Sequence, residues 1–200
     1  MVNEMKVKLG LSQHKHLPCL LYAGHSFPLW SYRRVHAIEK IGLELDNYGF
    51  SILADELELF NKYYLPPFSL NGLTVLDLGA CCGETAWFFL KHGAAKVVCV
   101  ELLKSRVNLM EINKKKLNLN MEIVSGAFDV EQLKIPHDFM KCDIEGAETL
   151  LLPYVSTLKP SVVEAHGSDI KDKFEKAGFH VSCQINPTTY LMSNYGDTFQ

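Results

Sequence analysis

A run of residues from Leu73 to Gly93 combines glycines with acidic and small side chains in an order that suits a nucleotide-like ligand. Its sequence is LTVLDLGACCGETAWFFLKHG. Gly79 and Gly83 would let the backbone turn tightly and approach a ligand where a Cβ would collide, and the helix expected after them presents unpaired N–H groups. Glu101 ends the next apolar segment, VVCVE, near the roughly 20-residue interval at which an acid in a βαβ unit reaches ribose hydroxyls. The pattern predicts a ligand that carries a ribose.

The glycine turn differs from the two common phosphate-binding loops. A dinucleotide-binding loop has the pattern GxGxxG and a P-loop ends in GKS or GKT, and neither pattern occurs at this turn. Asp77 comes just before the turn, where its carboxylate would repel a phosphate and attract an ammonium group. S-adenosylmethionine combines an ammonium group and a ribose with no phosphate. We therefore expect S-adenosylmethionine as the cofactor.

Three further polar side chains are expected at the same edge of the protein. Asp143 and Glu145 follow the apolar segment FMKC, and His166 follows SVVEA. Because ligands bind beyond the carboxyl ends of parallel strands, these side chains should converge near the cofactor. They are the candidates for a catalytic base. Alternatively, His166 hydrogen-bonds to the backbone, and Glu145 stabilises the first turn of a helix, which is the role favoured for Glu148.

Alternating strand and helix patterns position these residues. Strands are expected at 73–78, 96–101, 121–125, 138–143, 161–165, 179–185 and 188–193, and helices at 84–92, 104–118, 147–153 and 169–177. This alternation predicts an α/β fold with a mostly parallel sheet and helices on both faces. The short link at Asn186 and Pro187 cannot hold a parallel return, so the last two strands should form an antiparallel hairpin. Ser168 is the expected N-cap of the last helix.

Residues 1–54 are expected to form an N-terminal appendage, and residues 55–200 the cofactor-binding domain. Short apolar pieces interrupted by proline and glycine, such as LPCLLYAG, favour short strands and loops in the appendage. A helix is expected to begin near Asp55 and to stop before Pro66. Three aromatic residues near the boundary are candidates to cover the cofactor: Tyr48, Phe50 and Phe60.

The composition is that of an ordinary globular protein. Its 200 residues are 48% hydrophobic and 22% charged, and the net charge of −3 gives no overall attraction to nucleic acid or an anionic membrane. The sequence lacks the ~20-residue apolar run that spans a bilayer and shows no signal-type segment, so we expect a cytoplasmic protein. The six cysteines lack CxxC spacing and the eight histidines lack an HExxH pair, so no metal site is expected. Adjacent Cys81 and Cys82 are interpreted as small packing residues rather than a disulfide.

Two segments resemble class I S-adenosylmethionine-dependent methyltransferases. Residues 73–101 are similar to the first motif of these enzymes together with the acidic residue that ends the next strand, here Glu101. Residues 138–166, which include the run DIEGAE, resemble the FkbM group of that superfamily. The resemblance covers roughly residues 70–193 and implies a Rossmann-like sheet of seven strands, mostly parallel, with the last strand antiparallel.

The resemblance also implies contacts for individual residues. The methionine part of the cofactor would lie along Gly79, Ala80, Cys81 and Gly83, with Asp77 near its ammonium group. Glu101 would accept hydrogen bonds from both ribose hydroxyls, and Asp143 would lie on the crevice. The adenine would be bordered by Leu102, Gly126, Ala127 and Phe128. FkbM relatives usually have an Asn where this chain has Cys81, so a side-chain contact is lost there while backbone contacts remain.

The resulting expectation is an FkbM-like methyltransferase that methylates a hydroxyl of a small molecule or sugar. One alternative is an RNA methyltransferase, motivated by the run Lys114–Lys116, although a solvated helix face explains that run better in an acidic chain. Base-methylating enzymes of this fold commonly carry Asn/Asp-Pro-Pro-Tyr/Phe where this chain has Asp-Ile-Glu-Gly, which argues against an amine acceptor. A second alternative is a non-catalytic sensor or interaction protein that binds S-adenosylmethionine, motivated by the substituted Asn. Nucleic acid remains open as a partner, and a membrane is not expected.

Overall fold

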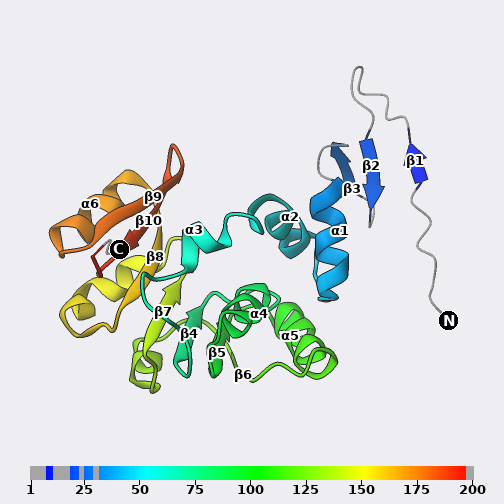
Figure 1. The fold of residues 1–200 in the computed structure, drawn as a ribbon. Helices are drawn as coiled ribbons and strands as arrows, with labels where there is room; N and C mark the ends of the chain where they lie inside the picture. The colour runs from blue at the N-terminus through cyan, green and yellow to red at the C-terminus, as the bar shows by residue number, and fades with distance from the viewer. Residues whose placement is uncertain (1–7, 11–18, 23–24, 29–31, 197–200) are drawn as a thin grey trace.

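Seven strands form a single twisted sheet between residues 74 and 193 (Figure 1). The structure is a computed structural model and describes residues 8–10, 19–22, 25–28 and 32–196. The strand order is β6-β5-β4-β7-β8-β10-β9. The strands are β4 (Thr74–Leu78), β5 (Lys96–Glu101), β6 (Met121–Ser125), β7 (Phe139–Cys142), β8 (Ser161–His166), β9 (His180–Asn186) and β10 (Thr189–Ser193).

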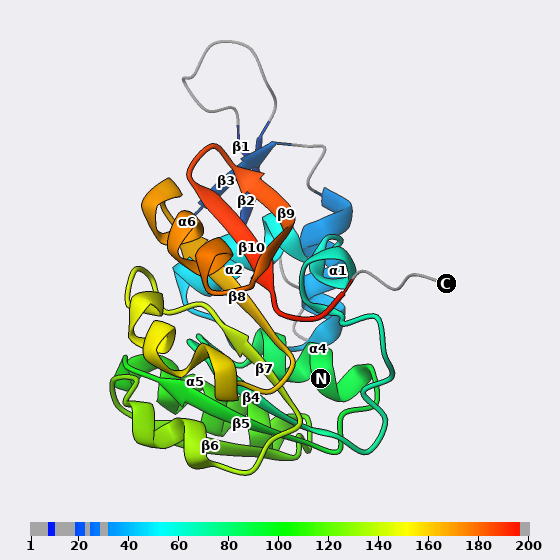
Figure 2. The same ribbon diagram turned by 90° about the vertical axis from the view of Figure 1, so that its left-hand side faces the viewer.

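The pairing of these strands confirms the predicted fold class. The pairs β6–β5, β5–β4, β4–β7 and β7–β8 are all parallel. The last strand, β10, is antiparallel to both of its neighbours, β8 and β9. The short link after β9 therefore makes the expected hairpin, and β10 inserts between β8 and β9 (Figure 2).

The direction of chain travel reverses between β4 and β7. From β4 the chain moves outward through β5 and β6, and it then crosses back to β7 on the other side of β4. Leu78 pairs with Val100 of β5 and with Cys142 of β7, so the carboxyl ends of these three strands lie side by side. This is the topological switch point at which open α/β sheets bind ligands.

Helices cover both faces of the sheet, as Figure 1 shows. On one face, α4 (Glu84–Lys91) and α5 (Lys104–Lys116) share a core cluster that includes Phe89 and Met110. On the other face, α6 (Ser168–Lys176) and the 3₁₀ segment η3 (Glu148–Thr157) share a second cluster with Leu151 and Phe174. A further 3₁₀ segment, η2 (Val130–Lys134), follows β6.

Two local expectations on this part of the chain need correction. The helix expected at 147–153 is the longer 3₁₀ segment η3, which contains Pro153; proline lacks the N–H of a regular α-helix, which weakens that geometry. Ser168 is the first residue of α6 rather than its N-cap. The N-cap position belongs to Gly167, whose φ of 120° suits glycine.

The N-terminal part contains both strands and helices. β1 (Lys8–Gly10), β2 (Cys19–Tyr22) and β3 (His25–Pro28) form a small antiparallel sheet, and the rest of residues 1–31 lies outside the described residues. Where short strands and loops were expected, residues 32–56 contain two helices, α1 (Tyr32–Ile41) and α2 (Asn47–Glu56). The helix expected from Asp55 is instead the short α3 (Phe60–Tyr64).

Helix α2 connects the N-terminal part to the sheet. Its side chains Phe50 and Leu53 are buried in the same core cluster as Val75 of β4 and Phe89 of α4. The expected boundary after residue 54 therefore falls inside a helix that packs on the domain. Among the described residues, no helix is long and apolar enough to cross a membrane.

Candidate functional site

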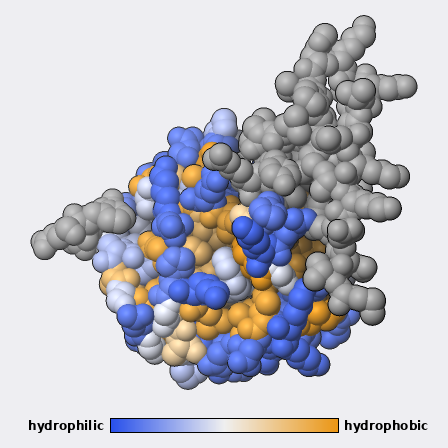
Figure 3. Space-filling model, turned by 45° about the vertical axis from the view of Figure 1, so that its right-hand side comes forward, coloured by the Kyte–Doolittle hydropathy of each residue, from blue (hydrophilic) through white to orange (hydrophobic). Residues whose placement is uncertain are grey.

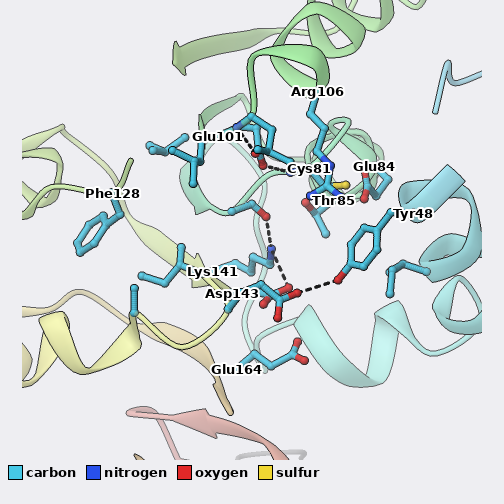
Figure 4. Close-up of a pocket in the computed structure, with 18 of the residues that line it drawn as sticks. Tyr48, Cys81, Glu84, Thr85, Glu101, Arg106, Phe128, Lys141, Asp143 and Glu164 are labelled. Carbon is cyan, nitrogen blue, oxygen red and sulfur yellow. Dashed lines mark hydrogen bonds and ion pairs between the residues drawn. The ribbon is translucent and has the colours of Figure 1, made fainter. Parts of the chain in front are cut away.

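A cavity of about 460 Å³ opens at the carboxyl ends of β4, β5, β7 and β8, beneath α2. Its volume lies in the range of small-molecule sites. Most of its lining residues fall into two groups, both visible in Figure 4. The glycine side comprises Gly79, Cys81, Glu84, Thr85, Glu101, Leu102, Leu103, Gly126, Ala127 and Phe128. The carboxylate side comprises Tyr48, Glu56, Phe60, Tyr64, Lys141, Asp143, Glu145 and Glu164.

The turn after β4 is shaped by residues with positive φ. Gly79 has a φ of 77°, and Cys81 has a φ of 48°. A Cβ at Gly79 would lie 1.7 Å from the backbone oxygen of Asp143, so the close approach of the loop after β7 requires glycine there. The N–H groups of Gly79 and Ala80 both donate to the carbonyl of Val100 on β5. These contacts hold the turn against the neighbouring strand ends.

Glu101 is held in place by two backbone donors. Its Oε2 accepts from the N–H of Cys81 at 2.9 Å, and its Oε1 accepts from the N–H of Leu103 at 2.7 Å. The side chain is buried at 5% exposure but lines the cavity. A carboxylate has about four lone-pair positions, so acceptor capacity remains for hydroxyl groups of a ligand.

Asp77 lies beneath the cavity and does not line it. Its Oδ2 accepts from the Thr85 hydroxyl at 2.5 Å, and its Oδ1 lies 3.3 Å from the ammonium of Lys141. Lys141 in turn donates to the carbonyl oxygen of Gly79 at 2.8 Å. The acid before the turn is therefore paired with a protein cation, and Lys141 lines the cavity above it.

An apolar slot lies beside Glu101. Large apolar side chains that line the cavity remain well exposed, including Leu102 at 64% and Leu150 at 49%. Ala127, Phe128 and Ile144 complete this slot. Figure 3 shows a face of the molecule on which apolar side chains reach the surface between hydrophilic ones. The faces of a flat aromatic ring would fit between such side chains.

The carboxylate side joins helix α2 to the ends of β7 and β8. The Tyr48 hydroxyl donates to Oε1 of Glu145 at 2.7 Å, and the guanidinium of Arg106 lies 4.5 Å from the centre of the Tyr48 ring. Arg106 also pairs with Asp46, the N-cap of α2, at 3.0 Å. The start of α2 is thereby tied to α5 and to the loop after β7.

His166, at the end of β8, is surrounded by acidic side chains. Its Nδ1 lies 2.8 Å from Oε1 of Glu148, which also accepts from the N–H of Gly146. Its Nε2 faces Glu164, Glu145 and Asp143 at 3.5, 3.6 and 3.9 Å. The sequence-based alternatives were a backbone partner for His166 and a helix-stabilising role for Glu148. The structure gives His166 a side-chain partner, Glu148, in place of the backbone. Glu148 is fully buried and lies in the first turn of η3, the position expected for a helix-stabilising acid.

Burial and close charges shift several pKa values in the cavity. Burial raises the pKa of Glu84 and of Glu56 to about 7. Burial also raises the pKa of Asp143 to about 7, with Lys141 opposing the shift. The hydrogen bond to Glu148 raises the pKa of His166 to about 10, so its ring is positively charged at neutral pH. Burial alone would lower the pKa of Lys141, but the carboxylates around it raise the value above its usual range.

The structure brings most of the predicted site residues to one cavity. Those that line it are Gly79, Cys81, Glu101, Leu102, Gly126, Ala127, Phe128, Asp143 and Glu145. Asp77, Ala80, Gly83 and His166 lie behind the lining and support it. Of the three aromatic candidates, Tyr48 and Phe60 line the cavity, whereas Phe50 is buried in the core.

Several lining residues were missed by sequence reasoning, among them Glu56, Tyr64, Arg106 and Lys141. Lys141 had a readable signal, because a lysine inside the short apolar strand FMKC must find a buried partner. The others come from helices whose contact with the strand ends depends on the tertiary fold. Glu164 lies in the segment 138–166 that resembles the FkbM group, but its position on the cavity was not anticipated.

Comparisons with known proteins identify the fold. No protein-family model and no curated protein sequence matches the chain. Among solved structures, a methyltransferase from Pyrococcus furiosus aligns with a TM-score of 0.61 at 15% identity, covering 83% of this chain and 95% of that one. A precorrin-6y C5,15-methyltransferase from Geobacter metallireducens aligns with a TM-score of 0.56 at 15% identity, covering 76% and 93%.

A SAM-dependent methyltransferase from Aquifex aeolicus aligns with a TM-score of 0.50 at 19% identity, covering 80% of this chain and 96% of that one. At these identities the likeness concerns the fold alone. The chain has the Rossmann-like fold of these methyltransferases, with the sheet order and antiparallel last strand described above.

Proposed function

We propose that the protein is an S-adenosylmethionine-dependent methyltransferase. The observation that carries the proposal is Glu101, whose carboxylate lines the cavity at the switch point while backbone N–H groups hold both of its oxygens. A carboxylate fixed in this way suits the two hydroxyls of a ribose. The fold shared with solved methyltransferases supports the same cofactor.

The rest of the glycine side suits the other parts of this cofactor. The apolar slot around Leu102, Ala127 and Phe128 would hold the adenine, and Gly79 and Cys81 would border the methionine part. Lys141, rather than Asp77, lies on the cavity at that end, so we propose that Lys141 takes part in holding the methionine carboxylate. The cofactor would supply a methyl group already activated on a sulfonium.

The carboxylate side is proposed to bind the methyl acceptor. It lies next to the expected methionine end, and Tyr48, Phe60 and Tyr64 enclose it. Because the donor is already activated, alignment of the acceptor with the methyl group does most of the chemical work. Asp143 and Glu145 line the cavity where an acceptor hydroxyl would lie, and His166 contacts both from behind.

A hydroxyl of a small molecule or sugar remains the proposed acceptor, in line with the FkbM-like run after β7. The acids of the carboxylate side support a small acceptor over RNA, because clustered carboxylates repel a phosphate backbone. The cover formed by α2 further restricts the space above the cavity. We also propose that the protein acts in the cytoplasm.

The direct test is transfer of a labelled methyl group from S-adenosylmethionine to a panel of hydroxyl-bearing small molecules and sugars, with bulk tRNA as a separate arm. We expect transfer to a hydroxyl compound and its loss in Asp143→Asn. A matched control is Asp172→Asn on α6, an exposed acid outside the cavity, which should retain full activity. Transfer to tRNA alone, with salt-sensitive binding, would show that the acceptor is RNA rather than a small molecule. Cofactor binding without transfer to any acceptor would support the sensor alternative.

A further inference from the structure

Glu56 is the last residue of α2, and its side chain lines the carboxylate side of the cavity. Within the described part of the chain, its carboxylate has neither a hydrogen bond nor an ion pair. A carboxylate at the C-terminal end of a helix faces the negative end of the helix dipole, which disfavours its charged form. The stability of α2 therefore does not account for an acid at this position.

Two other acids on the carboxylate side have protein partners for both of their oxygens. Glu145 accepts from the Tyr48 hydroxyl with Oε1 and faces Nε2 of His166 with Oε2. Glu164 accepts from the Tyr64 hydroxyl with Oε2 at 3.4 Å and faces the same ring nitrogen with Oε1. A proton taken from a bound acceptor would disturb these contacts at either acid.

The remaining sequence-based candidates for a base, Asp143 and His166, are less suited to take up a proton. Asp143 faces the ammonium of Lys141 at 3.8 Å and Nε2 of His166 at 3.9 Å, so a proton would compete there with two cations. The ring of His166 is already positively charged, because its hydrogen bond to Glu148 raises its pKa to about 10. Both of its nitrogens then carry a proton, and neither can accept another.

The surroundings of Glu56 favour uptake of a proton near neutral pH. Phe60 and Tyr64 of α3, each almost completely buried, line the same side of the cavity. Four charged side chains act on Glu56 from α2, β7, β8 and the loop after β7: Asp55, Lys141, Glu164 and Asp143. Burial raises the pKa of Glu56 to about 7, the three acids act in the same direction, and Lys141 opposes them. The neutral titratable groups near it are Tyr63 and Tyr64.

We propose that Glu56 is the general base that accepts the proton of the acceptor hydroxyl. This role rests on the proposed methyl transfer. As the O–C bond forms, the C–S bond of the sulfonium breaks, its electron pair stays on sulfur to leave a thioether, and the hydroxyl proton moves to the Glu56 carboxylate. The proton then leaves to solvent. Asp143 and Glu145 would orient the hydroxyl, and the protonated His166 would hold these two acids in place.

The proposal gives the N-terminal part of the chain a direct role in the reaction. Helix α2 is anchored on the sheet by Phe50 and Leu53, which are buried in the same core cluster as Val75 of β4. This anchoring fixes the end of the helix, and with it Glu56, over the carboxyl ends of the strands. A general base works best when its pKa lies near the pH at which the enzyme acts, and burial beneath α2 provides that condition.

The first test is a pH titration of the full chain alone, followed by infrared difference spectroscopy of its carboxyl groups. We expect a band of protonated carboxyl that grows as pH falls through about 7 in the wild type and is smaller by one carboxyl group in Glu56→Gln. Asp55→Asn is the matched control, because Asp55 is the preceding residue of α2, is exposed and does not line the cavity. That variant should keep the band.

The second test is the pH dependence of kcat for the hydroxyl compound that the transfer panel identifies, at saturating S-adenosylmethionine. The wild-type kcat should fall as pH drops below about 7, because protonated Glu56 cannot accept a proton. Glu56→Gln should lower kcat about 100- to 10,000-fold and remove that fall, with cofactor affinity unchanged by calorimetry. Glu56→Asp, which keeps a carboxylate, should recover part of the rate together with the fall. Asp55→Asn should match the wild type.

Three results would overturn the proposal: a kcat in Glu56→Gln within about threefold of the wild type, a fall near pH 7 that persists in this variant, or an unchanged infrared band. The second result would leave Asp143 as the base. Methyl transfer that survives in Glu56→Gln would contradict the base alone and retain the methyltransferase. Cofactor binding by the wild type without transfer to any compound would contradict the methyltransferase and the base together.

Discussion

The two sides of the cavity are built in different ways. On the glycine side, backbone N–H groups hold the site together, because Cys81 after β4 and Leu103 after β5 both donate to the Glu101 carboxylate. On the carboxylate side, side chains from separate elements hydrogen-bond to one another, as Tyr48 does with Glu145 and Tyr64 with Glu164. The glycine side depends on local backbone geometry, whereas the carboxylate side depends on tertiary packing.

This difference predicts that substitutions will separate the two sides. Changes on the glycine side should affect cofactor binding or the fold itself. Changes on the carboxylate side, other than at Lys141, should affect the acceptor and leave the cofactor bound.

The largest effect is expected for Gly79→Ala. A Cβ there would lie 1.7 Å from the backbone oxygen of Asp143 and would also meet a φ of 77°. We expect a loss of about 4 kcal/mol or more in the free energy of unfolding, measured by urea denaturation. Gly72→Ala is a matched control, because Gly72 has a φ of 79° but nothing within 4 Å of its Cβ. That variant should lose about 1–2 kcal/mol. Equal losses in both variants would show that the loop after β7 can shift to make room for the Cβ at little cost in free energy.

The next largest effect is expected for Glu101→Ala on cofactor affinity. Hydrogen bonds to a charged group contribute about 1.5–3 kcal/mol each, so loss of two should weaken S-adenosylmethionine binding at least ~100-fold. Glu122→Ala on the adjacent strand β6 is the control, because Glu122 is exposed and pairs with Lys96. Unchanged affinity in Glu101→Ala would show that the glycine side does not bind the cofactor.

An intermediate effect is expected for the pH dependence of stability in Glu84→Gln. Burial raises the pKa of Glu84 to about 7 from 4.5, so the folded chain binds more protons than the unfolded chain between these values. Stability from this residue is therefore present at low pH and lost as pH rises through about 7. Relative to the variant, the free energy of unfolding of the wild type should fall by about 3 kcal/mol between about pH 4 and about pH 8. Parallel pH curves for the two proteins would contradict the raised pKa.

The smallest effect is expected for Tyr48→Phe. The change removes the hydrogen bond to Glu145 but keeps the ring beneath Arg106. We expect the KM of the acceptor to rise about 3- to 10-fold, with cofactor affinity unchanged by calorimetry. Tyr190→Phe, which loses a hydrogen bond to the Pro187 carbonyl outside the cavity, should change neither. A loss of cofactor affinity in Tyr48→Phe would show that the two sides are not separable.

The same contrast explains how much could be predicted from the sequence. The alternation of strands and helices from β4 to β10, the hairpin at Asn186–Pro187 and the turn from Gly79 to Gly83 follow from local residue order. The structure contains them, except that the helix expected at 147–153 is the 3₁₀ segment η3. Glu101 could be placed because its distance along the chain from the turn is set by one βαβ unit.

The carboxylate side could be predicted only in part. Asp143 and Glu145 follow a strand and were expected at its end, but Tyr48 and Glu56 reach the cavity because α2 packs on the sheet through Phe50 and Leu53. The pairing of His166 with buried Glu148 likewise needs the loop after β7 to fold back toward β8. Contacts of this kind depend on tertiary geometry that residue spacing does not encode.

The central claim is that the cavity binds S-adenosylmethionine through Glu101. Calorimetry with S-adenosylmethionine, S-adenosylhomocysteine and NAD, on the wild type and on Glu101→Ala, tests it most directly. We predict that the wild type binds the first two ligands and not NAD, and that Glu101→Ala loses both. Binding of NAD in place of S-adenosylmethionine, or full affinity in Glu101→Ala, would contradict the claim.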